Sequence, residues 1–93
     1  MIYEMKNRCL IKDNGERIEL TELEHKFLIA ISDEEITPAK LIAKYIFSYC
    51  GDRYIEKLKV LQRRLNKFIQ VKRIEKLVGI KTSYILKTEI YFK

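Results

Sequence analysis

Residues 53–70 read RYIEKLKVLQRRLNKFIQ, and they carry the clearest structural pattern in the sequence. Its apolar residues recur every three or four positions, the spacing that gathers side chains on one side of an α-helix. This apolar stripe consists of Ile55, Leu58, Leu61, Leu65 and Phe68. A turn of about 100° per residue gives the opposite side a different set: Glu56, Val60, Arg63 and Lys67. We therefore expect a helix over residues 53–70 with a buried apolar side and an exposed cationic side.

Positive charge is concentrated in this half of the chain. Residues 1–46 contain seven Lys and Arg against nine Asp and Glu, whereas residues 47–93 contain twelve against four. The cations on or beside the outer side of the predicted helix are Arg53, Lys57, Lys59, Arg63, Arg64, Lys67 and, just beyond its end, Lys72. Glu56 is the one acid among them. A helix side that is merely solvated usually mixes both signs, so this asymmetry favours a surface that binds a polyanion.

Two shorter helices are predicted before this one. The first starts at Thr21, because the sequence Thr21-Glu22-Leu23-Glu24 is a capping box. Its apolar stripe is Leu23, Phe27 and Ile31, flanked by Leu20 and Leu28. The second starts at Thr37, with Pro38 at the first helical position, where its missing N–H costs nothing. Its stripe is Leu41, Ile42, Tyr45, Ile46 and Tyr49, and it ends at Cys50-Gly51-Asp52.

Strands are expected at both ends of the chain. Cys9–Lys12 and Arg17–Leu20 flank Asn14-Gly15, which predicts a hairpin with a two-residue turn. Residues 2–5 are a candidate third strand. After the last helix, β-branched and aromatic residues surround Gly79, and a second hairpin is predicted there, followed by a strand at Ile90–Phe92.

The order of these elements defines the expected fold. A hairpin, three helices and a hairpin predict an α+β winged helix-turn-helix in a single domain of residues 1–93. It divides into N-terminal strands over 1–20, a three-helix core over 21–70, and a wing with a C-terminal strand over 71–93. In such a unit the last helix enters the major groove of double-stranded DNA, and the hairpin touches the backbone or the minor groove.

Five short motifs resemble the DNA-binding effector domain of OmpR/PhoB-type response regulators. Leu20-Thr21 with Glu24 and Leu28 is similar to the family's opening of its first helix. Ile36-Thr37 with Leu41 resembles the opening of its second, and Ile46-Phe47 stands where the family usually has Val-Trp. Leu58, Leu61 and Leu65 match the recognition-helix pattern, and Ser83-Tyr84-Ile85-Leu86 resembles the end of the wing. The resemblance covers nearly the whole chain.

This resemblance implies a bacterial transcription regulator that binds direct repeats, as a possible homodimer. It places Arg53, Lys57, Lys59, Val60 and Gln62 at the DNA-facing positions of the recognition helix, and Lys76 or Lys81 in the place of the wing arginine. The connection at Cys50-Gly51-Asp52 is shorter than the family's polymerase-contacting loop, which argues against an RNA polymerase contact. The family's receiver domain is absent from these 93 residues.

The residues themselves suggest contacts for this helix. Arg63, Arg64 and Lys67 suit phosphates or guanine edges, with a solvated surface as the alternative. Val60 suits a thymine methyl, or is a stray exposed apolar residue. Tyr84 is expected in the core or at the base of the wing.

Other classes of function are disfavoured by composition. The chain has one histidine, His25, two cysteines outside any metal-binding spacing, and no phosphate-binding glycine loop, so we expect no enzyme, cofactor or metal site. No apolar run is long enough to span a membrane, and the N-terminus has no signal core, so a cytoplasmic protein is expected. The competing hypothesis is a winged-helix protein-interaction module, with Ile90–Phe92 as a strand that adds to a partner.

Overall fold

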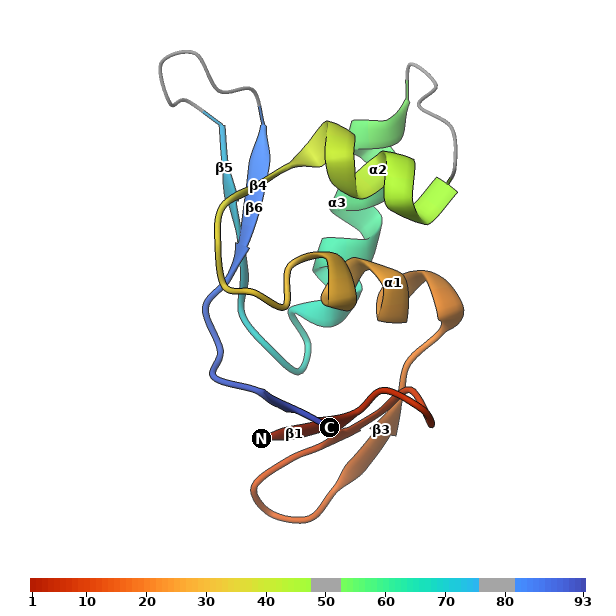
Figure 1. The fold of residues 1–93 in the computed structure, drawn as a ribbon, viewed down its shortest axis with the longest axis vertical. Coiled ribbons are helices and arrows are strands. Elements are labelled where there is room, and N and C mark those ends of the chain that lie inside the picture. The colour runs from red at the N-terminus through yellow and green to blue at the C-terminus, as the bar shows by residue number, and fades with distance from the viewer. Residues whose placement is uncertain (48–52, 76–81) are drawn as a thin grey trace.

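The computed structural model describes residues 1–47, 53–75 and 82–93. It is an α+β structure, as predicted, in which three helices lie between two small sheets (Figure 1). The helices are α1 (Glu22–Ala30), α2 (Ala39–Phe47) and α3 (Tyr54–Leu65). All three contact one another, and α3 passes behind α1 and α2 in the view of Figure 1. This arrangement is compatible with a winged helix.

The first sheet has four strands in the order β3-β2-β1-β7. They are β1 (Ile2–Glu4), β2 (Cys9–Ile11), β3 (Arg17–Glu19) and β7 (Tyr91–Phe92). The pairs β1–β2 and β2–β3 are antiparallel, which confirms the predicted N-terminal hairpin and its third strand. The last strand, β7, pairs in parallel with β1, so the two chain ends lie side by side (Figure 1).

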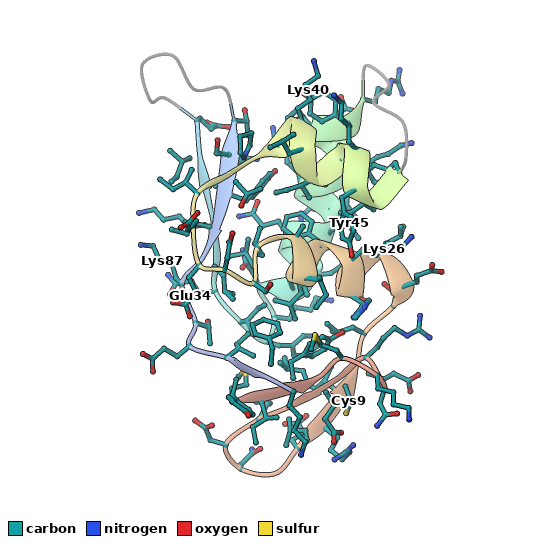
Figure 2. All side chains as sticks on the ribbon, in the orientation of Figure 1. Cys9, Lys26, Glu34, Lys40, Tyr45 and Lys87 are labelled. Atoms are coloured by element: carbon teal, nitrogen blue, oxygen red, sulfur yellow. The ribbon has the colours of Figure 1, made fainter. Side chains whose placement is uncertain are left out.

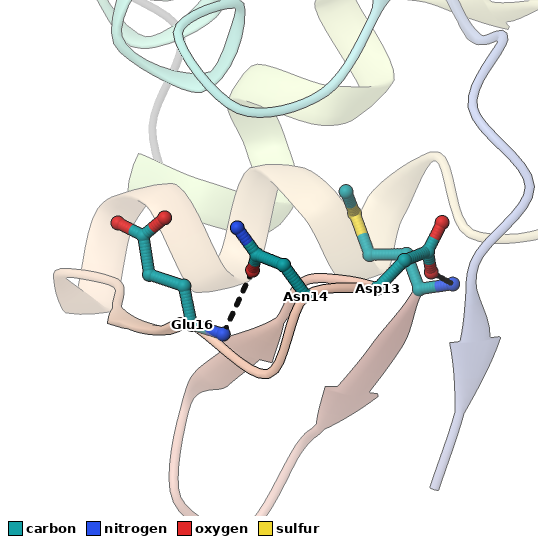
Figure 3. Close-up of polar contacts among 4 residues, drawn as sticks. Asp13, Asn14 and Glu16 are labelled. Atoms are coloured by element: carbon teal, nitrogen blue, oxygen red, sulfur yellow. Dashed lines mark hydrogen bonds and ion pairs between the residues drawn. The ribbon is translucent and has the colours of Figure 1, made fainter.

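The turn between β2 and β3 differs from the predicted two-residue turn. It has three residues, because the N–H of Gly15 donates to the carbonyl of Lys12 (2.9 Å) and the N–H of Lys12 donates to the carbonyl of Glu16 (2.8 Å). Gly15 takes a positive φ of 88°, whereas Asn14 does not. Asn14 acts instead through its side chain, whose Oδ1 accepts the N–H of Glu16 at 2.9 Å (Figure 3). The glycine therefore supplies the left-handed residue that such three-residue loops need.

Side-chain interactions fix the entry into the first helix. The hydroxyl of Thr21 accepts the N–H of Glu24, and the Glu24 carboxylate accepts the N–H of Thr21. The capping box predicted from the sequence is therefore confirmed. Phe27, Leu28 and Ile31 are fully buried, but Leu23 is exposed and lies outside the stripe to which it was assigned.

The second helix begins at Ala39, and the prediction that it begins at Thr37 is wrong. Thr37–Pro38 forms a short strand, β4, that pairs antiparallel with β6 (Ser83–Leu86). The N–H of Ala39 still donates to the carbonyl of Thr82 (2.9 Å) as the chain leaves this sheet. Proline suits an edge strand because it has no N–H to leave unpaired.

The predicted C-terminal hairpin is confirmed in its two strands. β5 (Val71–Ile74) and β6 pair antiparallel and join β4 in the order β4-β6-β5. In Figure 1 this hairpin stands beside α3 and projects away from the first sheet. The predicted turn around Gly79 lies outside the described residues.

The third helix is shorter than predicted. It ends at Leu65 rather than Gln70. The Oδ1 of Asn66, the residue that follows, accepts the N–H of Val71 at 2.8 Å and so bends the chain back towards β5. Asparagine readily bonds to nearby backbone in this way, in competition with helix. Lys67 and Phe68 consequently lie in the turn after the helix.

One cluster of buried apolar residues joins the helices to both sheets. The rings of Phe27 on α1 and Tyr84 on β6 meet edge to face, with centroids 5.3 Å apart. At the other end, the ring of Tyr3 meets that of Phe92 with centroids 5.9 Å apart. Further fully buried members are Leu10, Leu28, Ile31, Ile42, Leu58 and Leu65.

Some residues that periodicity assigned to the core are exposed. Leu41 and Tyr45 on α2 are 56% and 51% exposed, and Figure 2 shows Tyr45 between α2 and α1 on the surface. The helix buries Ala39, Ile42 and Ala43 instead. Tyr54 is half-buried, while Tyr49 lies outside the described residues.

Cys9 is a buried free thiol on β2, and Cys50 lies outside the described residues. In residues 1–47, 53–75 and 82–93, no helix has the length and apolarity that crossing a membrane requires.

Candidate nucleic-acid interface

The orientation of α3 is set by three leucines. Leu58, Leu61 and Leu65 are buried against the other helices and the sheets. Because these positions lie on one side of the helix, the opposite side is left to solvent. Glu56, Val60 and Arg63 are exposed there, as the sequence predicted.

This exposed side of α3 carries a group of cations, which we call the α3 basic surface. Arg53, Lys57, Arg63 and Arg64 are exposed, Lys59 is half-buried, and Lys67 is exposed in the turn that follows the helix. Within the described part of the chain, none of these six side chains forms an ion pair. No acid of the described residues therefore pairs directly with this charge.

The acids of the N-terminal half are used locally. Glu4 pairs with Arg17 at 2.6 Å across the first sheet. Glu16 and Glu22 pair with lysines four residues away, at 3.3 and 3.5 Å respectively. Glu19 and Glu24 line a surface hollow together with Arg64 and Lys67 but make no ion pair with either. The described acids of the N-terminal half therefore form no ion pair with the α3 basic surface, although two of them lie beside one border of it.

Val60 is not an isolated apolar residue on this surface. It lines a hollow of about 320 Å³ with Leu23, Phe47 and the side chains of Lys57 and Arg64. The Nζ of Lys57 lies 5.3 Å from the centre of the Phe47 ring, a cation–π contact between α3 and α2. One border of the α3 basic surface thus combines apolar groups with cations. Apolar groups suit the edge of a base pair, and cations suit the phosphate backbone of a nucleic acid.

Gln62, predicted as a DNA contact, makes a bond within the fold. Its Nε2 donates to the carbonyl of Val71 at 2.8 Å, while Asn66 accepts the N–H of the same residue at 2.8 Å. The two amides hold both polar groups of the Val71 backbone, and we call this pair the Val71 clamp. It fixes the start of β5, and so the base of the hairpin, against α3.

A second hollow, of about 420 Å³, separates α3 from β5. Its lining residues are Lys59, Gln62, Arg63, Asn66 and Arg73. Arg73 is half-buried and its Nε lies 3.1 Å from a carboxylate oxygen of Glu75. Neither Asn66 nor Arg73 was among the predicted site residues. Asn66 was predicted to lie inside a helix. Asparagine is common in turns, and this preference could have indicated that the helix ends before Asn66.

The hairpin contributes fewer described cations. Lys72 is exposed on β5. Lys76 and Lys81, the two predicted candidates for the wing contact, both lie outside the described residues. The described structure therefore places the eight predicted DNA contacts from Arg53 to Lys67 on α3 and at its two ends. The two predicted wing contacts are not among the described residues.

Tyr84 lies at the base of the hairpin, in the core as predicted. Its hydroxyl is buried and has no hydrogen-bond partner among the described residues. Burial raises the pKa of Tyr84. The positive charge of the nearby Arg73 guanidinium partly opposes this rise. Tyr84 therefore supports the hairpin from within and does not face a nucleic acid.

No protein-family model matches this sequence, and comparison with curated proteins finds no significant match.

Proposed function

We propose that this protein is a winged-helix transcriptional regulator that binds double-stranded DNA, with α3 in the major groove and the β5–β6 hairpin beside the adjacent backbone or minor groove. The observation that carries the proposal is the α3 basic surface: six cations without ion pairs in the described structure. The major groove is about 12 Å wide and admits one α-helix.

Each residue of this surface has a role in the proposal. Arg63, at the centre of the exposed side, is the candidate for a bidentate contact to guanine, which contributes about 1–3 kcal/mol of discrimination. Val60 lies beside it and suits a thymine methyl. Gln62 is assigned a positioning role, because its amide is bonded to Val71. The remaining cations are phosphate contacts, which set affinity rather than sequence preference: Arg53, Lys57, Lys59, Arg64 and Lys67.

The resemblance to OmpR/PhoB-type effector domains extends this proposal to paired direct repeats, bound by two copies in the bacterial cytoplasm. Selection of bound duplexes from a random pool, with the purified protein, tests it. Recovery of two copies of one short motif at a fixed spacing is the expected result. Recovery of a single motif would keep the DNA-binding proposal and reject the pairing.

Salt dependence tests whether binding uses the α3 basic surface. With several phosphate contacts, the affinity for a labelled duplex should fall by orders of magnitude between about 50 and 200 mM salt. Arg63→Gln should weaken binding, whereas Lys44→Gln, the same change of charge on an exposed residue of α2, should weaken it less. Equal effects of the two variants would indicate non-specific attraction to a basic protein.

A protein-interaction module is the alternative, and one observation favours it. Leu41 and Tyr45 are the most exposed residues lining an apolar hollow of about 330 Å³ between α1 and α2. The strand β7, which the sequence offered as a free edge, is already paired on one side with β1. Absence of duplex binding at low salt would shift the function to this alternative.

A further inference from the structure

The hollow between α3 and β5 differs from the rest of the α3 basic surface in its chemistry. Three cations from two elements converge on it, Lys59 and Arg63 from α3 and Arg73 from β5. Its other lining residues are the neutral amides Gln62 and Asn66, so no carboxylate of the described residues lines it. A concave site with this composition attracts an anion more strongly than cations on a convex surface do, because its walls hold several donors at one point.

The amides at this site are held in place before any ligand arrives. Gln62 uses one hydrogen of its Nε2 for the carbonyl of Val71, and Asn66 uses its Oδ1 for the Val71 N–H. Each side-chain amide carries two N–H donors. One donor of Gln62 and both donors of Asn66 therefore have no hydrogen bond within the described residues. Donors that are already fixed lose little conformational entropy when they bind.

Arg73 has donors to spare as well. Its Nε faces Glu75 at 3.1 Å, whereas a guanidinium has five N–H donors in a planar fork. The side chain of Arg73 is 29% exposed, compared with 52% for that of Glu75. The Arg73 side chain is therefore the more enclosed partner, and its donors other than Nε can reach an anion in the hollow.

We propose that this hollow binds one phosphate group, held by Lys59 and Arg73 with the Gln62 and Asn66 amides as additional donors; Arg63 adds positive charge to the lining while its guanidinium takes the guanine contact. A tetrahedral phosphate offers several acceptor oxygens to forked donors from different directions, a match that guanidinium groups favour. A volume of about 420 Å³ has room for such a group with water around it, since one water occupies about 30 Å³. Resting on the proposed function, the group is a phosphodiester of the DNA backbone between α3 and the hairpin; free phosphate compounds share the chemistry.

Titration of the ¹⁵N-labelled protein with inorganic phosphate tests the site without DNA. The side-chain amide signals of Gln62 and Asn66 should shift and saturate, and Arg73→Gln should abolish saturation. Lys72 provides the matched control, since it neighbours Arg73 on β5 and is exposed, and Lys72→Gln should retain the shifts. Unmoved amides, or the same saturation in Arg73→Gln, would overturn the proposal. If Arg73→Gln does not fold, Lys59→Gln replaces it with the same expectations.

Duplex binding in the same variants separates this inference from the proposed function. Arg73→Gln removes one phosphate contact. The slope of log affinity against log salt should therefore become shallower by about 0.9, and by the same amount for all DNA sequences. If Arg73→Gln binds duplexes with the wild-type slope while Arg64→Gln, which removes a phosphate contact outside the hollow, does not, the hollow inference fails and DNA binding stands. If phosphate saturates the amides but no duplex binds at low salt, the site stands as one for free phosphate compounds and the proposed function fails.

Discussion

The phenol oxygen of Tyr3 lies 2.6 Å from Nδ1 of His25 and joins β1 to α1. Burial raises the pKa of Tyr3 far above its ordinary value, so the phenol keeps its proton and can donate it in this bond. Burial, assisted by the nearby charge of Arg8, lowers the pKa of His25. Burial therefore favours the neutral imidazole, whose Nδ1 can accept the phenol proton.

This bond predicts a loss of stability on mild acidification. Because the pKa of His25 is lower in the folded state than its ordinary value of 6.5, the unfolded chain takes up the proton more readily. The contribution of His25 is complete above about pH 6.5 and declines as the pH falls from there towards the folded-state pKa. Urea midpoints at pH 7.5 and 5.5 should differ more in the wild type than in His25→Gln. Equal differences in the two proteins would contradict this assignment.

Two buried tyrosines should respond in opposite ways to loss of their hydroxyl groups. Tyr3 and Tyr84 are both fully buried, but among the described residues only the Tyr3 hydroxyl has a hydrogen-bond partner. Tyr3→Phe should lower the free energy of unfolding by about 1–2 kcal/mol, because it also leaves the His25 Nδ1 unpaired. Tyr84→Phe should leave the stability unchanged or raise it by up to about 1 kcal/mol. Chemical denaturation at pH 7.5 measures both, and a similar loss in Tyr84→Phe would reveal an interaction of its hydroxyl in solution.

The Val71 clamp should be sensitive to a nearly isosteric change. Gln62→Glu replaces the amide that donates to the Val71 carbonyl with a carboxylate that cannot. A buried carbonyl left without its donor costs about 1–3 kcal/mol, so the variant should be destabilised at neutral pH. Protonation of the new carboxyl restores a donor, so part of the loss should be recovered in acid, relative to the wild type at the same pH. A deficit that grows on acidification would argue against the clamp.

The conformation of Gly15 predicts a graded series at one position. Its φ of 88° is strained for residues with a Cβ, yet no atom lies within 4 Å of the position that a Cβ would occupy. The cost of Gly15→Ala is therefore conformational, about 1–2 kcal/mol. Gly15→Asn should cost less, because asparagine tolerates positive φ better than alanine. Thermal unfolding of the two variants checks the order, and equal losses would indicate that the turn rearranges.

Local signals in the sequence predicted much of the fold. The Thr21–Glu24 capping box, the leucine stripe of α3 and the turn residues around Gly15 are each specified by near neighbours in the chain. Such features depend little on the rest of the molecule, and the elements that they define are present. The positions of their ends were less predictable, since both wrong boundaries depend on distant partners. Thr37–Pro38 is a strand because β6 lies beside it, and α3 ends early because Asn66 reaches Val71.

The sequence predicted which residues of the candidate site are exposed on α3. It did not predict which residues of other elements they contact. Periodicity placed Arg63 and Val60 on the exposed side of α3, because the opposite leucines had to be buried. It could not reveal that Gln62 is engaged with Val71, nor that Arg73 faces the same hollow as Lys59. Both relationships join residues of different elements, and α-helical spacing carries no information about what packs beside the helix.

The parallel pairing of β1 with β7 has a consequence for how the chain folds during its synthesis. The N–H of Tyr91 donates to the carbonyl of Met1 at 3.0 Å, and the N–H of Lys93 to that of Tyr3 at 2.9 Å. Closing a loop between such remote positions is slow compared with forming local hairpins. During synthesis on the ribosome, the first strands must wait with one edge open until residues 91–93 emerge.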